Sequence, residues 1–324
     1  MTEPTTAIPT PPGATQDRHI GGACRLTLNG GIDAGTDLSG IALVGDHLFL
    51  GADEGHQLQV LSRGQRADDW DLRRRIALAN QGDEADIEAI AYGDGYLYVA
   101  GSHSARRRLM KADLSVKRNR ERLLEVRQEA SRSRLYRLAF DPDTGEIGKA
   151  KSISLTKRLR KDPLLKLFWG IPSKENGIDI EGIDCREGTL YAGFRGPVLR
   201  DNYVPLMRFP FDDPKAYRLL FVRLDGQGIR DLAALEEGFL LIAGPVNDAP
   251  GPFRLWWWDG EDQIPGKGRS VRPALMLGEI STPGGAKAEG LTLVAQHEGN
   301  AEIIVLYETD SVTQAVRMQV PLPG

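Results

Sequence analysis

The chain has 324 residues, of which 41% are hydrophobic and 37 are glycine, and its 41 lysines and arginines nearly balance 45 aspartates and glutamates. Such a composition is typical of a globular protein and excludes a disordered, collagen-like or coiled-coil chain. No apolar run is long enough to cross a membrane, and the first residues lack the apolar core of an export signal, so we expect a soluble cytoplasmic protein with no membrane partner.

The charge is unevenly distributed along the chain. Residues 106–166 contain 19 basic and 8 acidic side chains, whereas the whole chain has a net charge of −4. A strongly basic segment is therefore carried by an acidic body. The two cysteines, Cys24 and Cys185, are too few and too far apart to predict a disulfide framework or a zinc site.

The N-terminal segment is predicted to have two parts. Residues 1–20 are rich in proline and threonine and are expected to form a disordered tail, and residues 21–324 form one domain. Within that domain the segment 24–28 is a short apolar strand. We expect it to pair with the last unit of the repeat described next and so to cover an exposed sheet edge.

A motif of two short apolar strands around a Gly/Asp turn recurs five times along the chain, which is a hairpin signal. Its third position is occupied in turn by Ser39, Glu88, Glu181, Arg230 and Glu289. Two of the four intervals between these residues are 49 residues long. Further strands follow the second and third copies, at 135–140 and 150–155 and at 206–211 and 217–224, which gives four strands per unit.

Four-stranded units repeated around an axis are the blades of a β-propeller. The predicted fold is therefore an all-β, five-bladed propeller. Six blades fit less well because each would be shorter than the observed spacing. Trp256, Trp257 and Trp258 lie in the fourth unit and are expected to pack between blades.

Two segments without the motif, at about 106–133 and 156–176, are predicted to be insertions. Strong helix formers and Glu/Arg spacings of three and four predict an exposed helix over 116–130. A second helix is expected from Thr156 to Trp169, with a new turn starting at Asp162. The basic insertion is either a solvated face, a lid, or a surface for a protein or nucleic-acid partner.

The repeated segments Asp86-Ile-Glu-Ala-Ile, Asp179-Ile-Glu-Gly-Ile and Ala288-Glu-Gly-Leu carry a family resemblance. Over residues 23–320 the chain resembles an uncharacterised bacterial family catalogued as domain of unknown function 3616. It is more distantly similar to the phytase-like and esterase-like β-propellers, whose blades also open with Glu-Gly-Leu or Glu-Gly-Ile. The first resemblance implies a propeller fold, and the second implies calcium-dependent phosphate-ester chemistry.

In a propeller the starts of the innermost strands and the ends of the second strands meet at one mouth of the central channel. The strand starts place there Ser39, Asp86, Glu88, Asp179, Glu181, Arg230, Asp231 and Glu289. The strand ends add Asp53, Glu54, Ser102, His103, Arg195 and Asn247. The sequence therefore predicts a polar site that receives residues from all five blades.

Roles at this mouth follow from the chemistry of each residue type. Glu88, Glu181 and Glu289 are expected to bind calcium or another divalent cation, because clustered carboxylates repel one another unless a cation neutralises them. Arg195 and Arg230 are expected to bind an anionic substrate group, and His103 to transfer a proton. Substrate contacts are assigned to Ser39, Asp53, Glu54, Ser102, Asp231 and Asn247.

These assignments lead to two functional hypotheses. The first is a metal-assisted hydrolase that binds a small phosphate ester or other anionic ester in the central pocket. The second is a non-enzymatic scaffold that recruits a protein or nucleic acid through the basic insertion. A structural alternative for the repeated glutamates is that each pairs with a neighbouring blade and holds the ring together.

Overall fold

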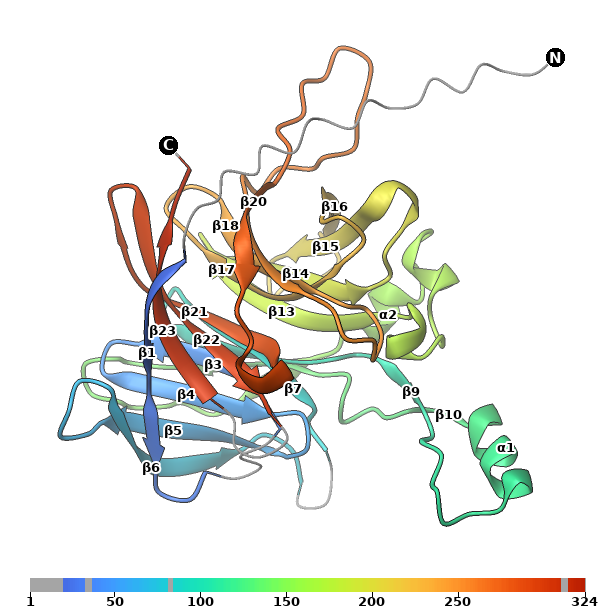
Figure 1. Cartoon of the computed structure of the whole chain (residues 1–324), viewed down its shortest axis with the longest axis horizontal. Helices are drawn as coiled ribbons and strands as arrows, with labels where there is room; N and C mark the ends of the chain where they lie inside the picture. The colour runs from blue at the N-terminus through green and yellow to red at the C-terminus, as the bar shows by residue number, and fades with distance from the viewer. Residues whose placement is uncertain (1–19, 33–36, 81–83, 310–313, 324) are drawn as a thin grey trace.

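The computed structural model describes residues 20–32, 37–80, 84–309 and 314–323, and these form a ring of five β-sheets (Figure 1). The predicted N-terminal tail lies outside the described residues except for Ile20. No helix in the described part of the chain is long and apolar enough to span a membrane.

Each blade is an antiparallel sheet that begins at the central channel with its first strand. Blade 1 contains β3 (Leu38–Val44), β4 (His47–Ala52), β5 (Gln57–Arg63) and β6 (Asp69–Ala77). Blade 2 contains β7 (Ile87–Gly93), β8 (Tyr96–Gly101), β11 (Leu135–Ala139) and β12 (Lys151–Ile153). Blade 3 contains β13 (Asp179–Arg186), β14 (Thr189–Gly196), β15 (Tyr203–Phe209) and β16 (Arg218–Arg223).

The remaining two blades have the same architecture. Blade 4 contains β17 (Gly228–Ala234), β18 (Phe239–Gly244), β19 (Phe253–Trp258) and β20 (Leu275–Ile280). Blade 5 contains β21 (Lys287–His297), β22 (Asn300–Glu308) and β23 (Gln314–Pro321), with β1 (Gly21–Arg25) as its outermost strand. Four four-stranded sheets and the sheet of blade 1, to which one further strand is added, surround one axis and confirm the predicted five-bladed propeller.

The N-terminal strand joins the last blade to the first. β1 pairs antiparallel with β23, where Cys24 lies opposite Arg317. β2 (Thr27–Asn29) then pairs in parallel with β6 of blade 1. The predicted closing strand at 24–28 is therefore present, but it is divided between two sheets.

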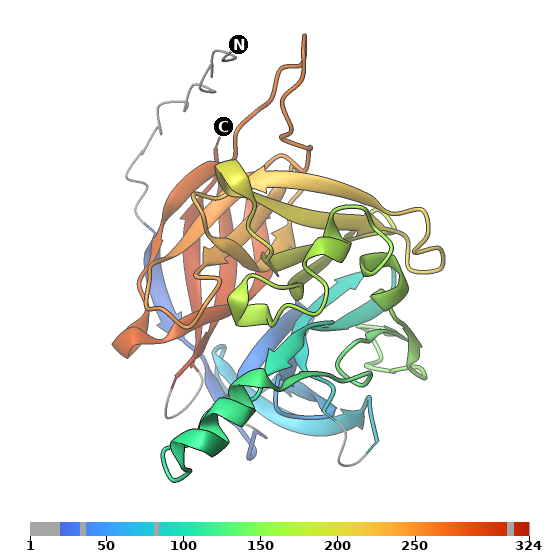
Figure 2. The same ribbon diagram turned by 90° about the vertical axis from the view of Figure 1, so that its right-hand side faces the viewer.

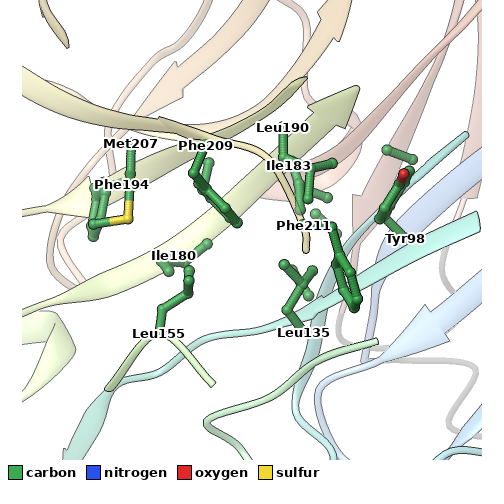
Figure 3. Close-up of a cluster of buried hydrophobic side chains, with 14 of the residues drawn as sticks. Tyr98, Leu135, Leu155, Ile180, Ile183, Leu190, Phe194, Met207, Phe209 and Phe211 are labelled. Atoms are coloured by element: carbon green, nitrogen blue, oxygen red, sulfur yellow. The ribbon is translucent and has the colours of Figure 1, made fainter. Parts of the chain in front are cut away.

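Five hydrophobic clusters fill the spaces between neighbouring blades, one at each junction of the ring. Figure 3 shows the cluster between blades 2 and 3, in which Tyr98 and Leu135 face Ile183 and Phe209. The three tryptophans of β19 alternate as expected in a strand. Trp256 and Trp258 pack toward blade 3, and Trp257 packs toward blade 5, which confirms their predicted packing between blades.

The two segments expected to be insertions contain shorter helices than predicted. In the first, β9 (Ala105–Arg107) pairs with β10 (Val126–Gln128) and α1 (Val116–Leu124) lies between them. The second contains α2 (Thr156–Leu159) and the 3-10 turns η1 (Leu165–Leu167) and η2 (Ser173–Glu175). Two more 3-10 turns occur outside the insertions, η3 (Arg200–Asn202) and η4 (Pro283–Gly285).

Candidate functional site: an acidic cluster at the channel mouth

The innermost strands of the five blades contact one another in a ring, β3 with β7, β7 with β13, β13 with β17, β17 with β21 and β21 with β3. The repeated third position of the motif lies at or close to the start of each of these strands. The blade repeat therefore brings Glu88, Glu181, Arg230 and Glu289 to one mouth of the channel.

One chain of ion pairs links three of the five blades. Arg195 at the end of β14 lies 2.5 Å from Asp179 and 2.7 Å from Glu181. Arg230 lies 2.9 Å from the other Glu181 oxygen and also pairs with Glu289. Both guanidinium groups are buried and each bridges two carboxylates. Arg195 and Arg230 thus neutralise protein carboxylates, which removes the support for their predicted role as anion-binding residues.

A second chain of ion pairs starts at blade 2 and leads outward. Arg132 pairs with Asp86 at the mouth and lies 3.2 Å from Glu84. Glu84 lies 3.2 Å from Arg106, whose guanidinium is 3.1 Å from Glu129. Arg132 could not be identified from the sequence, because nothing in a run of basic residues distinguishes the buried member from the exposed ones.

Glu88 differs from the other carboxylates at the mouth because no ion pair or hydrogen bond involves it within the described part of the chain. Burial and the charges of Asp86 and Glu181 raise its pKa well above the ordinary range. Without a bound cation, the carboxyl group of Glu88 therefore favours its neutral, protonated form.

A possible metal site is formed by Glu88, Asp179 and Glu181, which can place one oxygen each within 4.8 Å of the others. Glu289 was expected in this group, but it is paired with Arg230 instead. Burial is the largest influence and opposes its ionisation, yet the charge and hydrogen bond of Arg230 together with the charges of Arg195 and Lys287 outweigh it and lower its pKa. The acidic triad could therefore hold a metal ion, with Asp179 in the place predicted for Glu289.

His103 is buried and both of its ring nitrogens contact the backbone. Nδ1 lies 2.8 Å from the Gly101 oxygen, and Nε2 lies 3.1 Å from the Leu155 amide nitrogen, from which it accepts a hydrogen bond. Burial lowers its pKa to about 4, so the ring is neutral near physiological pH. This arrangement fastens the second insertion to β8 and argues against the expected proton transfer by His103.

Two of the residues predicted to contact the substrate form hydrogen bonds between neighbouring blades. Ser39 donates a hydrogen bond to the Ile87 carbonyl of blade 2. Asp231 accepts hydrogen bonds from Leu232 at 2.8 Å and from Leu291 of blade 5 at 2.7 Å. These contacts agree with the structural alternative, in which polar residues at the strand starts hold the ring together.

The other predicted contacts divide between the mouth and its periphery. Ser102 is buried, and its hydroxyl lies 2.8 Å from that of Ser104. Asn247 and Glu54 are exposed, and Asn247 caps its own turn by accepting from the Ala249 amide at 3.0 Å. Asp53 is partly buried, and burial together with the charge of Asp86 raises its pKa to about 7. Of this group, Asp53 alone combines a place at the mouth with titration near neutral pH.

The fold has many structural relatives of low sequence identity. Glutaminyl cyclase from Myxococcus xanthus is 14% identical over 93% of this chain and 96% of its own, with a TM-score of 0.47. An exo-beta-1,3-galactanase from Phanerochaete chrysosporium is 9% identical over 93% of this chain and 64% of its own, also with a TM-score of 0.47. A Trypanosoma rangeli sialidase is 13% identical over 93% of this chain and 60% of its own, with a TM-score of 0.43.

No curated protein matches the chain in sequence. A family profile does match, over residues 37–320, which include all five inner strands and the acidic cluster. The resemblance inferred from the repeated Asp-x-Glu segments is thereby confirmed: the chain belongs to the family described as "Protein of unknown function (DUF3616)".

Proposed function

We propose that the channel mouth binds a divalent cation, with calcium preferred, and that the chain is a cation-dependent hydrolase of a phosphate or other anionic ester. The observation that carries the proposal is the unpaired carboxylate of Glu88 beside Asp179 and Glu181.

Charge balance supports a cation of charge two. Four carboxylates form ion pairs at the mouth, from Asp86, Asp179, Glu181 and Glu289, and the carboxylate of Glu88 lies beside them. Three guanidinium groups face them, from Arg132, Arg195 and Arg230. These five carboxylates exceed the three guanidinium groups by two charges, which a divalent cation or two protons would neutralise.

The ligand types support a hard cation. All three members of the triad offer carboxylate oxygens, which calcium and magnesium prefer, whereas zinc favours nitrogen and sulfur ligands. Calcium accepts six to eight oxygen ligands in flexible geometry. Three carboxylates would therefore leave coordination positions for water and for a substrate oxygen.

Each residue at the mouth would then have a distinct role. The cation would polarise the ester and offset the negative charge that develops during its cleavage. Asp53, whose pKa is raised to about 7, would accept a proton at neutral pH in the role expected of His103. Arg195 and Arg230 hold Glu181 between them and so orient one ligand. An anionic ester would be repelled by this mouth without the cation, so hydrolysis should require it.

The test is calcium titration of the metal-stripped full-length chain by calorimetry, followed by hydrolysis assays with phosphate and carboxylate esters. Glu88→Gln should weaken calcium binding by about tenfold or more, which corresponds to about 1.4 kcal/mol. Glu54→Gln is the matched control, because this glutamate is exposed and outside the triad. Asp53→Asn should retain calcium binding and lose hydrolysis. Absence of calcium binding, or equal binding by the Glu88→Gln variant, would refute the proposed site.

A further inference from the structure

An arm, defined as residues 105–128, stands away from the propeller. It consists of β9, a loop, α1 and β10, and Figures 1 and 2 show α1 projecting beyond the blades. None of the residues of α1 is buried. The helix therefore contributes nothing to the hydrophobic clusters of the ring.

The arm concentrates exposed apolar side chains. Within the described part of the chain, six of the eight large hydrophobic residues with high exposure belong to it, and only Leu167 and Ile264 lie elsewhere. The most exposed are Leu124 at 85%, Leu109 at 76% and Val116 at 71%. Such a concentration on one small projection marks a contact surface.

Hydrogen bonds and an ion pair within the arm hold its loop and helix in place. Ser115 caps α1 by accepting a hydrogen bond from the Arg118 amide at 3.3 Å. The Asn119 side chain bonds both backbone groups of Lys111, at 3.0 and 2.8 Å. At the base, Arg108 lies 2.6 Å from Glu125. The apolar residues are thus held outward by the local structure.

The same surface is strongly basic. Residues 106–128 contain nine arginines and lysines against three acidic residues. Within the described part of the chain, no ion pair or side-chain hydrogen bond involves the charged groups of Lys111, Lys117 and Arg120. Lys117 and Arg120 lie on α1 and Lys111 in the loop before it, and in the sequence Lys111 and Lys117 directly follow the exposed Met110 and Val116.

We propose that the arm attaches the protein to the surface of an anionic lipid bilayer. Apolar side chains of a basic helix enter the boundary between headgroups and acyl chains, while its cations contact anionic headgroups. This attachment lies in the plane of the surface and needs no spanning segment. It therefore replaces the expectation, based on the lack of a long apolar run, that a membrane is not a partner.

Other occupants fit the arm less well. A second copy would bring two like-charged helices together. A single-stranded nucleic acid would favour aromatic stacking residues, and the arm contains no phenylalanine, tyrosine or tryptophan. A folded acidic protein would need a groove that matches a narrow projection, whereas a fluid bilayer adapts to it.

The test is co-sedimentation of the full-length chain with vesicles of phosphatidylcholine alone or mixed with phosphatidylglycerol, with a chelator present to prevent bridging by calcium. We expect binding only to the mixed vesicles, and binding should weaken as salt is added. Leu109→Asp/Leu124→Asp should reduce the partition coefficient at least tenfold. Leu167→Asp, which alters an exposed leucine outside the arm, is the matched control and should leave binding unchanged.

Because α1 has no buried residue, the arm variant should retain the circular dichroism spectrum and melting temperature of the unmodified chain. Lys117→Glu/Arg120→Glu should weaken binding to mixed vesicles in the same way. The proposal is overturned if the chain does not bind mixed vesicles or if the arm variants bind as well as the control. It is equally overturned if the arm residues instead support dimerisation or RNA binding with no vesicle binding.

Discussion

The carboxylate of Glu88 and the imidazole of His103 show how burial acts on two titratable groups in opposite ways. Burial disfavours the charged form of each, so it raises the pKa of Glu88 and lowers that of His103. The His103 ring stays neutral and forms hydrogen bonds with two backbone groups. Glu88 has no such partners among the described residues, and its charged form therefore depends on what enters the channel.

The sign of the pH dependence follows from the raised pKa of Glu88. A carboxyl with a raised pKa in the folded state stabilises the fold most below its unfolded pKa, and this contribution is lost as pH rises through the folded value. We expect the metal-free Glu88→Gln variant to lose less stability than the unmodified chain between pH 5 and pH 8. Thermal unfolding at several pH values, with a chelator present, measures this difference.

The Glu88→Gln variant and the unmodified chain are compared at each pH because other groups titrate in the same pH range. Asp53 and Asp86 have pKa values raised to about 7 and about 6, and they act in the same direction as Glu88. His103 acts in the opposite direction, since its lowered pKa makes its contribution fall as pH decreases from about 6.5 toward 4. If the stability of the Glu88→Gln variant and of the unmodified chain depends on pH in the same way, ionisation of Glu88 does not destabilise the fold.

The sequence located the acidic mouth because the blade repeat gives Glu88 and Glu181 equivalent positions. It could not assign partners within the mouth. Arg195 and Arg230 are chemically suited to an anionic ligand, and their pairing with Asp179, Glu181 and Glu289 depends on contacts between blades that no spacing encodes. For the same reason the metal-binding group contains Asp179 in place of Glu289.

At the scale of the strand, the glycine of the Glu-Gly-Ile/Leu motif allows neighbouring inner strands to approach closely. A Cβ atom added at Gly290 would lie 2.6 Å from the Ser39 backbone oxygen, and one added at Gly182 would lie 2.9 Å from the Asp231 Cα atom. A side-chain hydrogen bond joins a further pair of inner strands, from the Leu291 amide of blade 5 to Asp231 of blade 4. The motif therefore serves blade packing as well as the acidic mouth.

Gly290→Ala should destabilise the fold by about 1–3 kcal/mol, because the added carbon meets backbone of the next blade, which cannot rotate away. Denaturant unfolding of the variant beside the unmodified chain measures this loss. Gly266→Ala is the control, since its added carbon would have no neighbour closer than 3.8 Å. If both variants unfold at the same denaturant concentration, close packing does not explain the motif glycine.

Element boundaries in the insertions were less predictable than the blades. The Glu/Arg spacing that favoured a helix over 116–130 is compatible with an end at Leu124, because Glu125 then pairs with Arg108 across the arm and with Arg127 of β10. Residues 126–128 form β10 with the 105–107 segment. In the second insertion, Asp162 accepts hydrogen bonds from the Leu164 and Leu165 amides and starts a new turn, as expected, but α2 has already ended.

At the scale of the whole molecule, residues 20–29 join the first and last blades. The Leu26 amide donates to Ala315 of blade 5 at 2.8 Å, and the next amide, of Thr27, donates to Asp68 beside blade 1 at 2.9 Å. The Leu26 side chain is only 5% exposed and belongs to the cluster between these two blades. A strand at this position was predictable from the need to cover an edge, but its division between two sheets depends on the curvature of the ring.

Removal of residues 1–29 should therefore open the ring between blades 5 and 1, whereas removal of residues 1–19 keeps every contact of β1 and β2 described above. We expect the longer truncation to expose the edge of β23, to melt at a lower temperature and to aggregate. Leu26→Ala should give a graded version of this effect, with a loss of about 2–5 kcal/mol. Thermal unfolding with simultaneous light scattering compares the three proteins with the full chain. Equal melting temperatures and scattering for the two truncations would mean that the five blades stay closed without the N-terminal strand.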